Sequence, residues 1–440
     1  MKVIADLEVH SKYARAVSPR NTLPNISEWA EKKGIGLVGT GDFTHPVWLR
    51  ELEAQLEEEK KGIYKLKGVD QKTRFLLTSE VSCIYSHKGK GRRVHLMIYL
   101  PGFSKVRQFN KELVKLGANL MSDGRPIIGL TLAQVAKIAL AVEPDAIIVP
   151  AHIWTPWFGF YGHLGGFESL EEAFGDIADS IHTIETGLSS DPAMNWKIEE
   201  LSNRNIVSFG DAHSPQKLGR EATVLEVKAL DYENIRTALN TRPKSSTGIN
   251  SKIAYTIEFY PEEGKYHYTG HRKCNVIYSP KQARKMGVAC PVCGRSLTLG
   301  VMSRVEQLAS REIETEAEKD KLGVRWIKDR KGVRPPYVML VPLAEIISEA
   351  LGVGVGSQKV MGVYEQLVKT IGPEFKILLN TPTEELGKVA DPKVVEGITR
   401  VRSGDIVIEP GYDGVFGKVK IWKDEGVEKG ESSTDQATLF

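Results

Sequence analysis

The segment Asp6-Leu7-Glu8-Val9-His10-Ser11 decides the interpretation of the fold. It closes a short apolar run that predicts a β-strand, and it places a carboxylate and an imidazole where that strand ends. Similar apolar runs alternate with helical patterns through the first half of the chain, which is typical of an α/β fold with mostly parallel strands. The predicted strands are Lys2–Leu7, Ile35–Thr40, Phe75–Thr78, Val94–Leu100, Ala146–Val149, Ile181–Ile184, Ile206–Phe209 and Thr223–Val227.

Amphipathic helical patterns lie between these strands, for example over Ser27–Lys33 and Leu132–Val142. Seven or eight such units in the first half of the chain indicate a closed or nearly closed barrel. The polar stretch Arg242–Asn250 is rich in turn-forming residues and predicts the end of this unit. We therefore expect a first domain over residues 1–245.

Almost every predicted strand carries an acid or a histidine at its end. In barrels of this kind the C-terminal ends of the strands meet at one face, where active sites are built. His95 is the exception because it begins its strand, but a hairpin between the strands of Glu80 and His95 would return it to the same face. The other residues of this set are Glu8, His10, Asp42, His45, His152, Glu185, Asp211 and His213.

These side chains predict a metal centre when they are taken together. One histidine at a strand end is more often a capped or core residue than a ligand. The whole set would repel and desolvate its members unless cations paired them. Mixed histidine and carboxylate ligands suit Zn²⁺, Mn²⁺ or Fe²⁺, and Mg²⁺ or Mn²⁺ is the alternative to zinc in the catalytic site. Several clustered ions suit phosphoryl chemistry, because they activate a water, orient the phosphate and neutralise the leaving oxygen.

The series of motifs resembles the PHP (polymerase and histidinol phosphatase) family. The family's opening motif is normally Asp-Leu-His-x-His-Ser, and Glu8 replaces the first histidine here. Gly-Thr-Gly-Asp42-Phe-Thr-His45 stands where the family has an Asp-His pair, altered by a short insertion. The remaining motifs follow in order at Glu80, His95, His152 and Gly210-Asp211-Ala212-His213.

The resemblance implies a PHP-type distorted (β/α)7 barrel with a trinuclear metal centre. In that pattern Glu80 bridges two ions, and Glu80 and Asp211 set the ion spacing for catalysis. One ion would also take Glu8, His10 and Asp211; the second would take His95 and His152; the third would take His213 with either His45 or Asp42. Glu185 is a further candidate ligand, and Asp191 is a candidate for positioning substrate or water.

Three of the four cysteines belong to a second motif. Cys274 is followed by Cys290-Pro-Val-Cys293-Gly, and this spacing predicts a zinc-ribbon-like module with a tetrahedral structural zinc. His271 is the first candidate for the fourth ligand and His267 the second. Three unpaired buried cysteines are the less favoured alternative, because proline and glycine around the CxxC suit a knuckle turn. Cys83 lies in an apolar run and is expected in the core.

Three further parts are expected after the barrel. Residues 246–334 should hold the zinc module and a linker helix, since the charged stretch Val305–Lys321 is helix-prone. Residues 335–423 should form a helical region that ends in a small β piece. Residues 424–440 should form a flexible, polar tail.

The helical region contains a glycine-rich turn between two amphipathic patterns, Leu351-Gly-Val-Gly354-Val-Gly356-Ser-Gln-Lys359. It resembles the turn of a helix-hairpin-helix, whose backbone amides at a helix N-terminus can hold a DNA phosphate. Gly354 and Gly356 would then contact DNA. A plain connection between helices is nearly as well supported.

Two other segments suggest contacts. The loop after His152 carries Trp154, Trp157, Phe158 and Tyr161, which could wall a base pocket by stacking or could equally pack on the barrel. The tail residues Gln436, Leu439 and Phe440 resemble a shortened peptide that binds the PCNA sliding clamp, and an ordinary frayed tail is the alternative.

The order of the modules resembles a family of archaeal PHP-domain DNA repair endonucleases. The resemblance implies hydrolysis of the phosphodiester 5′ of deaminated bases (uracil, hypoxanthine, xanthine), with abasic sites as further substrates and with DNA and PCNA as partners. Two alternatives stand. A PHP small-molecule phosphatase would not need the second half of the chain, and a non-catalytic DNA or clamp adaptor would be expected to lose metal ligands.

Charge and hydropathy limit which partners and which cellular location are expected. The net charge of +3 does not by itself call for nucleic acid, and basic clusters such as Lys88–Arg93 are more often solvated surface. No apolar run approaches the ~20 residues that a membrane span needs. The first residues lack the pattern of a signal peptide. We expect a cytoplasmic, nucleoid-associated protein with no membrane contact.

Overall fold

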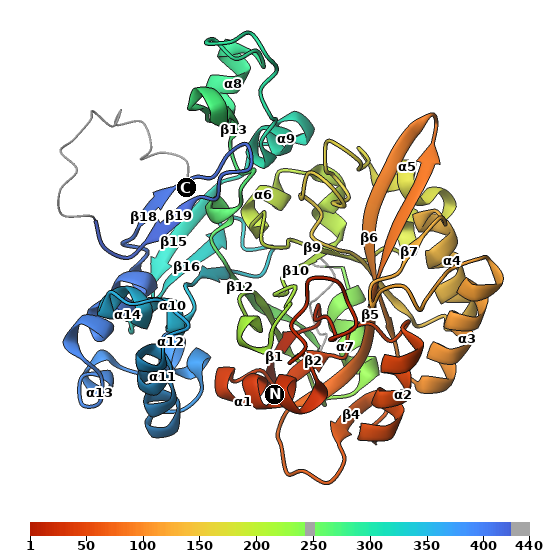
Figure 1. Ribbon diagram of the computed structural model, residues 1–440, viewed down its shortest axis with the longest axis horizontal. Helices are drawn as coiled ribbons and strands as arrows, with labels where there is room; N and C mark the ends of the chain where they lie inside the picture. Colours follow the sequence, from red (N-terminus) through yellow and green to blue (C-terminus); the bar gives the residue numbers. More distant parts are fainter. Residues whose placement is uncertain (243–250, 424–440) are drawn as a thin grey trace.

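The computed structural model describes residues 1–242 and 251–423 and contains one large mixed β-sheet (Figure 1). The sheet has 13 strands, and their order along its main path is β15-β16-β17-β12-β11-β1-β2-β5-β4-β3. Its strands are β1 (Lys2–Asp6), β2 (Leu37–Gly39), β3 (Leu56–Lys60), β4 (Ile63–Leu66), β5 (Arg74–His87), β6 (Lys90–Leu100), β7 (Ile127–Ile128), β8 (Ile147–Pro150), β11 (Ala222–Glu226), β12 (Lys252–Glu258), β15 (Thr315–Lys319), β16 (Arg325–Asp329) and β17 (Tyr337–Met339).

Each of the eight predicted strands is present. The remaining two, β9 (Thr183–Glu185) and β10 (Asn205–Val207), form a separate parallel pair. A parallel bridge between Val9 and Ala212 brings the chain after β10 beside the end of β1. The segments that end in the predicted site residues therefore lie side by side.

The expected hairpin between β5 and β6 is confirmed, and the two strands pair antiparallel along their whole length. Glu80 lies in the middle of β5 and not at its end, because the basic turn sequence itself continues the ladder as far as His87 and Lys90. β6 is also antiparallel to β8, and β11 is antiparallel to β1. The sheet is consequently more mixed than the predicted, mostly parallel one.

Helices cover the sheet where the sequence pattern places apolar residues on one side. In α4 (Leu132–Val142), the apolar face is buried and Thr131 and Gln134 form a capping box. The other helices of this half are α1 (Leu23–Lys33), α2 (Pro46–Gln55), α3 (Phe103–Lys115), α5 (Leu170–Phe174), α6 (Pro192–Trp196) and α7 (Tyr232–Asn240).

The sheet continues across the predicted domain boundary. β12 pairs antiparallel with β11 and parallel with β17, so strands on both sides of that boundary share one sheet. The linker helix is shorter than expected, since α9 (Val301–Leu308) ends well before Lys321. The charged segment Thr315–Lys319 is the strand β15, paired with β16. Here the edge pairing overrides the local helix propensity.

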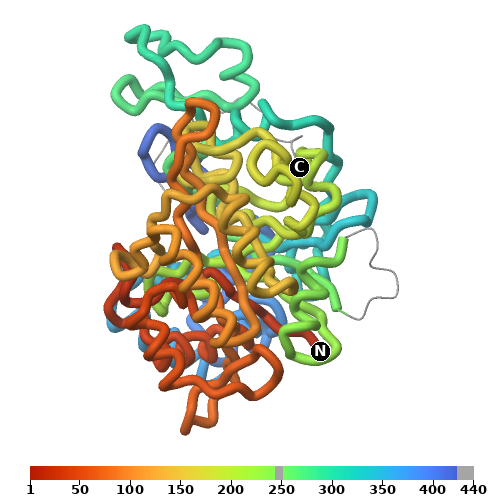
Figure 2. The backbone as a smooth tube through the Cα atoms, turned by 90° about the vertical axis from the view of Figure 1, so that its right-hand side faces the viewer, coloured from red at the N-terminus to blue at the C-terminus, as the bar shows by residue number. Residues whose placement is uncertain are grey.

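The cysteine module projects from the body of the molecule in both ribbon and tube views (Figures 1 and 2). It consists of β13 (Thr269–His271), β14 (Val276–Tyr278) and α8 (Pro280–Met286), followed by the loop that carries Cys290 and Cys293. The antiparallel pair β18 (Val407–Glu409) and β19 (Lys418–Lys420) is the expected small β piece.

The helical region joins the core of the first half. Its helices are α10 (Leu343–Leu351), α11 (Gln358–Thr370), α12 (Glu374–Asn380), α13 (Thr383–Leu386) and α14 (Pro392–Ser403). A buried ion pair of 3.0 Å joins Lys33 of α1 to Glu374 of α12. The carboxylate of Glu374 also accepts from the Tyr364 hydroxyl and from the Leu343 backbone N–H. Within residues 1–242 and 251–423, no helix is both long and apolar enough to cross a membrane.

Candidate metal centre

Glu80 is the residue around which the candidate centre is built. Its Oε1 lies 2.5 Å from His95 Nδ1 and 3.1 Å from His152 Nε2. Its Oε2 lies 3.0 Å from His10 Nε2. The side chain is almost fully buried, and its two oxygens face two separate groups of ligand atoms. Glu80 therefore contacts side chains of both groups.

His10 belongs to the second group. Its Nε2 lies 3.2 Å from Asp211 Oδ1, and its ring packs edge-on against His213 at 4.9 Å. His10 Nδ1 meets Asp42 Oδ1 at 3.0 Å. Asp42 therefore holds the His10 ring by its far nitrogen, an arrangement that orients metal-binding imidazoles in proteins.

The candidate ligand atoms thus form two compact groups in the first half of the chain. Each group brings its ligand atoms within 4.8 Å of one another: Glu80, His95 and His152 in one, and His10, Asp211 and His213 in the other. His213 was expected at a third ion with His45 or Asp42. The structure brings His213 beside His10 and Asp211, and Asp42 contacts His10 of the same group.

Three of these residues have left-handed backbone: Asp42 at φ 49°, His152 at φ 28° and Asp211 at φ 44°. Such conformations cost a non-glycine residue of order 1–3 kcal/mol and collect at functional sites. In this chain they turn the side chains that follow β2, β8 and β10 toward one another.

Glu8 and Glu185 lie behind the two groups and are fully buried. Within the part of the chain that the structure describes, both oxygens of Glu8 and the Oε1 of Glu185 have no hydrogen-bond partner, while Glu185 Oε2 accepts from the His152 backbone N–H. Burial raises the pKa of both carboxyls well above the usual range, and their proximity adds to the effect for Glu8. Buried carboxylate oxygens without partners are what a set of cation ligands leaves when the cation is removed, so the residues fit a divalent metal.

Burial and the neighbouring carboxylates also shift the pKa values of the histidines. Burial lowers the pKa of His95 to about 4, which keeps its ring neutral and able to bind a metal. Burial also opposes charge on His152 and His10, but Glu80 with Glu8 raises the pKa of His152 to about 9, and Asp42, Asp211 and Glu80 raise that of His10.

His45 and Asp191 are predicted residues whose side chains cap helices. His45 caps α2, since its Nδ1 accepts from the Trp48 backbone N–H, and its ring stacks on Tyr13. Asp191 caps α6 by accepting from the Met194 N–H, and it also accepts from the Tyr337 hydroxyl. These contacts occupy both side chains in local structure.

Arg125 is a residue of the centre that the sequence analysis missed. Its Nη1 lies 3.1 Å from Glu80 Oε2 and 3.4 Å from His10 Nε2. It comes from an irregular segment before β7, where no strand pattern or acid-histidine motif marks it. Arginine preceded by Gly and followed by Pro is common in ordinary turns, so the sequence carried no usable signal.

The aromatic loop divides into a buried and an accessible part. Trp154 and Tyr161 are 1% and 0% exposed and bond to Asn195 and Glu200. Their expected contact with substrate is therefore corrected to a role in the core. Phe158 lies with its ring 4.6 Å from that of His95, and Trp157 is 37% exposed with its ring against Tyr266, just before the cysteine module.

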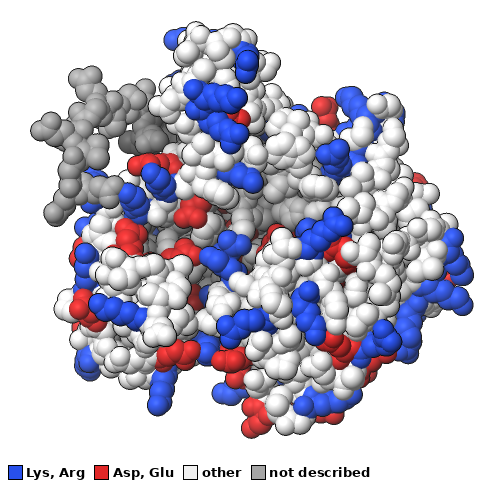
Figure 3. Space-filling view, in the orientation of Figure 1, with Lys and Arg blue, Asp and Glu red and all other residues white. Residues whose placement is uncertain are grey.

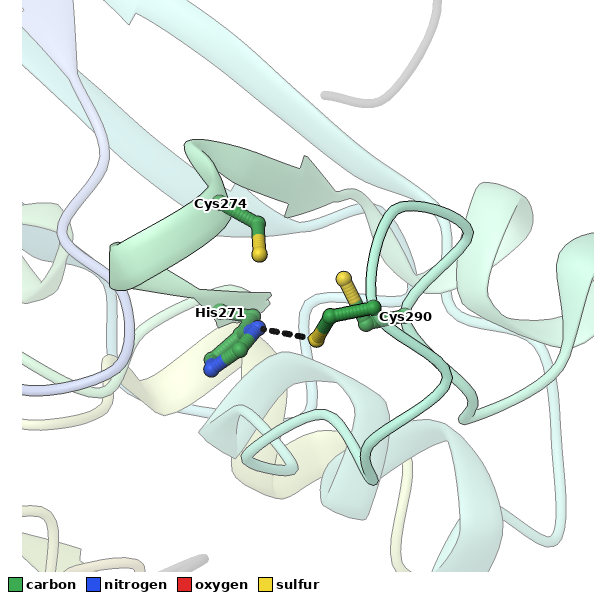
Figure 4. A group of neighbouring side chains, drawn as sticks. His271, Cys274 and Cys290 are labelled. Carbon is green, nitrogen blue, oxygen red and sulfur yellow. Dashed lines mark hydrogen bonds between the residues drawn. The ribbon is translucent and has the colours of Figure 1, made fainter.

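The cysteine module gathers His271, Cys274, Cys290 and Cys293, with ligand atoms within 4.8 Å of one another. Figure 4 shows His271, Cys274 and Cys290 directed toward one common point. Although burial opposes it, hydrogen bonds from His271 and from the Val292 and Cys293 backbone N–H groups lower the pKa of Cys290 to about 6. His267 is buried away from this group, so His271 supplies the fourth candidate ligand.

The predicted helix-hairpin-helix turn lies between α10 and α11. Ser357 caps α11 by accepting from the Val360 N–H, and Gly354 and Gly356 have no atom close to where a side chain would begin. The turn is thus open on the side of both glycines. Gln436, Leu439 and Phe440 lie outside the described residues.

Lysine and arginine side chains, with some acidic ones between them, lie around a hollow on the face of the molecule shown in Figure 3. The open side of the metal centre is formed by His213, Asp211 and Arg125, whose side chains are 33%, 26% and 22% exposed. All other members of the two barrel groups are less than 10% exposed.

Comparison with known proteins shows which proteins this chain resembles. A family model described as the MJ0043 C-terminal domain matches residues 342–405. An uncharacterized protein of Methanocaldococcus jannaschii, MJ0043, is 34% identical over 301 residues, which are 66% of this chain and 34% of that protein. The chain therefore spans about a third of the length of that relative.

Two solved structures match over nearly the whole chain. The lesion-specific endonuclease PfuEndoQ of Pyrococcus furiosus is 34% identical with a TM-score of 0.79, covering 96% of this chain and 95% of that one. Endonuclease Q bound to a 27-mer duplex substrate with an abasic lesion at the active site gives the same identity and TM-score, covering 96% and 97%. With this identity over full-length coverage, the chain belongs to the endonuclease Q family.

Proposed function

We propose that this protein is a metal-dependent DNA repair endonuclease that hydrolyses a phosphodiester next to a damaged nucleotide. The observation that carries the proposal is the pair of ligand groups joined by Glu80, in a chain that matches lesion-specific endonucleases from end to end. An adaptor that had lost catalysis would have no need to keep these buried acids, and a small-molecule phosphatase would have no need of the zinc and helical parts.

The residues that would hold divalent ions are Glu80 with His95 and His152, and His10 with Asp211 and His213. Bound ions would supply Lewis acids for the phosphate and lower the pKa of a water. Glu80 keeps the two sites at a fixed separation, and Asp42 keeps the His10 ring oriented. Asp211 and His213 lie on the exposed side, where the scissile phosphate would enter.

We extend the proposal to the kind of lesion. Deaminated bases such as uracil, hypoxanthine and xanthine pair poorly, so their extrusion costs less than that of a normal base, and an abasic site needs no base extruded. Phe158, which contacts His95, and Trp157, which is exposed, would stack on the nucleotide that enters the centre. The abasic duplex held by endonuclease Q supports this substrate class.

The proposal also includes the finer architecture. Residues 1–245 would be the PHP-type barrel, 246–334 the module with structural zinc, 335–423 the DNA-binding helical region and 424–440 a tail that binds the PCNA clamp. The basic surroundings of the hollow in Figure 3 suit a polyanion.

The test is a nicking assay on duplexes that carry one uracil, hypoxanthine, xanthine, abasic site or mismatch, with the cut mapped to the nucleotide. We expect a metal-dependent cut on the 5′ side of the lesion and none in an undamaged duplex. Glu80→Gln should abolish the cut and reduce barrel-bound metal, while circular dichroism stays unchanged.

Metal analysis of the active protein is the measurement that could refute the proposed mechanism. Protein that cuts lesion duplexes after complete removal of barrel-bound metal would refute the mechanism. Hydrolysis of phosphomonoesters with no nicking of any duplex would favour a phosphatase.

A further inference from the structure

Arg125 is placed by the same segments that build the metal centre. Its backbone N–H donates to Asp123 Oδ1 at 3.1 Å. The neighbouring Gly124 donates to the Tyr13 carbonyl, and its own carbonyl accepts from the Thr44 hydroxyl at 3.2 Å. A Cβ on Gly124 would lie 2.4 Å from Asp42 Oδ2, so this backbone packs directly against the centre.

The guanidinium is only partly used by the protein. Among the described residues its hydrogen bonds all run through Nη1, to Glu80 Oε2 and His10 Nε2. The side chain keeps 22% of its surface exposed, on the side where Asp211 and His213 are also open. The N–H groups of Nε and Nη2 therefore remain for a ligand that approaches from solvent.

A role as countercharge for Glu80 alone does not account for this arrangement. Glu80 already contacts His10, His95 and His152. A planar guanidinium with free donors beside a candidate metal pair matches the oxygens of a phosphate diester, which it can bind through two parallel hydrogen bonds.

We propose that Arg125 is a catalytic residue that donates hydrogen bonds to a non-bridging oxygen of the scissile phosphate. This inference rests on the proposed phosphodiesterase function. Arg125 would stabilise the charge that develops on the phosphate oxygens during displacement, in addition to any metal ion. The anion recognised is a phosphodiester, whatever base or lesion it carries.

The first experiment compares Arg125→Ala and Arg125→Lys with Arg107→Ala, an exposed arginine that pairs with Glu53 on another part of the surface. Cleavage of an abasic duplex should fall by about 10²-fold or more in Arg125→Ala, the scale for loss of one preorganised donor. Arg125→Lys should recover part of the rate, and guanidinium ion added to Arg125→Ala should recover more. Arg107→Ala should match the wild type.

The second experiment needs no cleavage. Titration calorimetry of metal-loaded protein with inorganic phosphate should give at least tenfold weaker binding in Arg125→Ala, with unchanged metal content and thermal midpoint. A rate and phosphate affinity within threefold of the wild type would overturn the inference. Loss of metal in Arg125→Ala would also overturn it, because Arg125 would then support the ion sites and not the substrate.

Hydrolysis of the small diester bis(4-nitrophenyl) phosphate tests the role of Arg125 independently of the repair function. Wild-type protein that hydrolyses this diester with the same dependence on Arg125, but nicks no lesion duplex, would refute the repair function and support the role of Arg125. Nicking of lesion duplexes by Arg125→Ala at the wild-type rate would support the repair function and refute the role of Arg125.

Discussion

Glu258 is a buried acid at the end of β12, and it contacts Ser208, which follows β10. Its Oε1 accepts from the Ser208 hydroxyl at 2.6 Å, and its Oε2 has no partner among the described residues. Burial raises its pKa to about 8, and the charge of Asp191 adds to the shift. The folded protein thus holds a proton on Glu258 that the unfolded chain releases at a lower pH.

The sign of the pH dependence follows from this shift. The pKa of Glu258 is 4.5 in the unfolded chain and about 8 in the folded protein, so between these pH values the folded state binds more protons than the unfolded state. The resulting contribution to stability is fully present below pH 4.5 and is lost as the pH rises from there to about 8. The loss per group is at most about 1.4 kcal/mol for each pH unit. Glu258→Gln should therefore flatten the fall in thermal midpoint between pH 5 and pH 8.

The matched control is Glu226→Gln, the same change on an exposed side chain of the neighbouring strand β11. It should leave the pH profile of the wild type as it is. If Glu258→Gln and wild type lose stability in parallel across the window, Glu258 is not the group that carries the proton.

At the scale of elements, the cysteine module is predicted to bind one zinc ion independently of the barrel. Cys290 is buried and lies at the centre of the ligand group. Cys290→Ser should lose about one metal equivalent and lower the thermal midpoint, since structural zinc contributes directly to folding. Cys83→Ser changes a thiol that lies apart from the group and should keep the metal. Equal zinc in the Cys290 variant and wild type would contradict the assignment.

The contact between α1 and α12 predicts how firmly the helical region is attached. Lys33 and Glu374 are 3% and 2% exposed, so Lys33→Met would leave a buried carboxylate without its cation. Removing one partner of such a pair typically costs about 3–5 kcal/mol. The double variant Lys33→Met with Glu374→Gln should regain part of that loss. Proteolysis of the helical region and thermal unfolding would measure both effects.

The adjacent residue provides the comparison. Lys32 makes exposed ion pairs with Glu28 and with Glu365 of α11. Lys32→Met should cost no more than about 1 kcal/mol, as exposed pairs do. Equal effects at Lys32 and Lys33 would mean that burial does not decide the strength of this junction.

At the scale of the whole molecule, the first half of the chain and the helical region share one hydrophobic core that includes Leu23 and Phe375. The body should therefore act as a unit, with the tail as the separable part. Deleting 436–440 should leave nicking of short duplexes within twofold of the wild type and remove any stimulation by a PCNA clamp, because tethering to the clamp raises the local concentration of enzyme on DNA. Replacing Gly430 to Asp435 by a glycine-serine linker is the control. Clamp binding that survives the deletion would show that the motif is not used.

The sequence by itself determined the succession of strands and the residues that follow them. Apolar runs of strand length are local features, and the acids and histidines directly after them were predicted as ligands on that ground alone. The resemblance to the PHP family grouped Glu80, His95 and His152, and these three side chains do lie together. The cysteine spacing was equally informative, because a CxxC knuckle is formed by residues adjacent in the chain.

The tertiary structure alone decided which side of each loop is buried and which distant groups meet. His271 and His267 are four residues apart, but only His271 faces the cysteines. Trp154 and Trp157 belong to one loop, yet one lies in the core and the other is exposed. Arg125 reaches Glu80 across 45 residues of sequence because hydrogen bonds with two other segments, at Tyr13 and at Thr44, position its turn. Contacts of this kind depend on packing between segments, and no local pattern of residues encodes them.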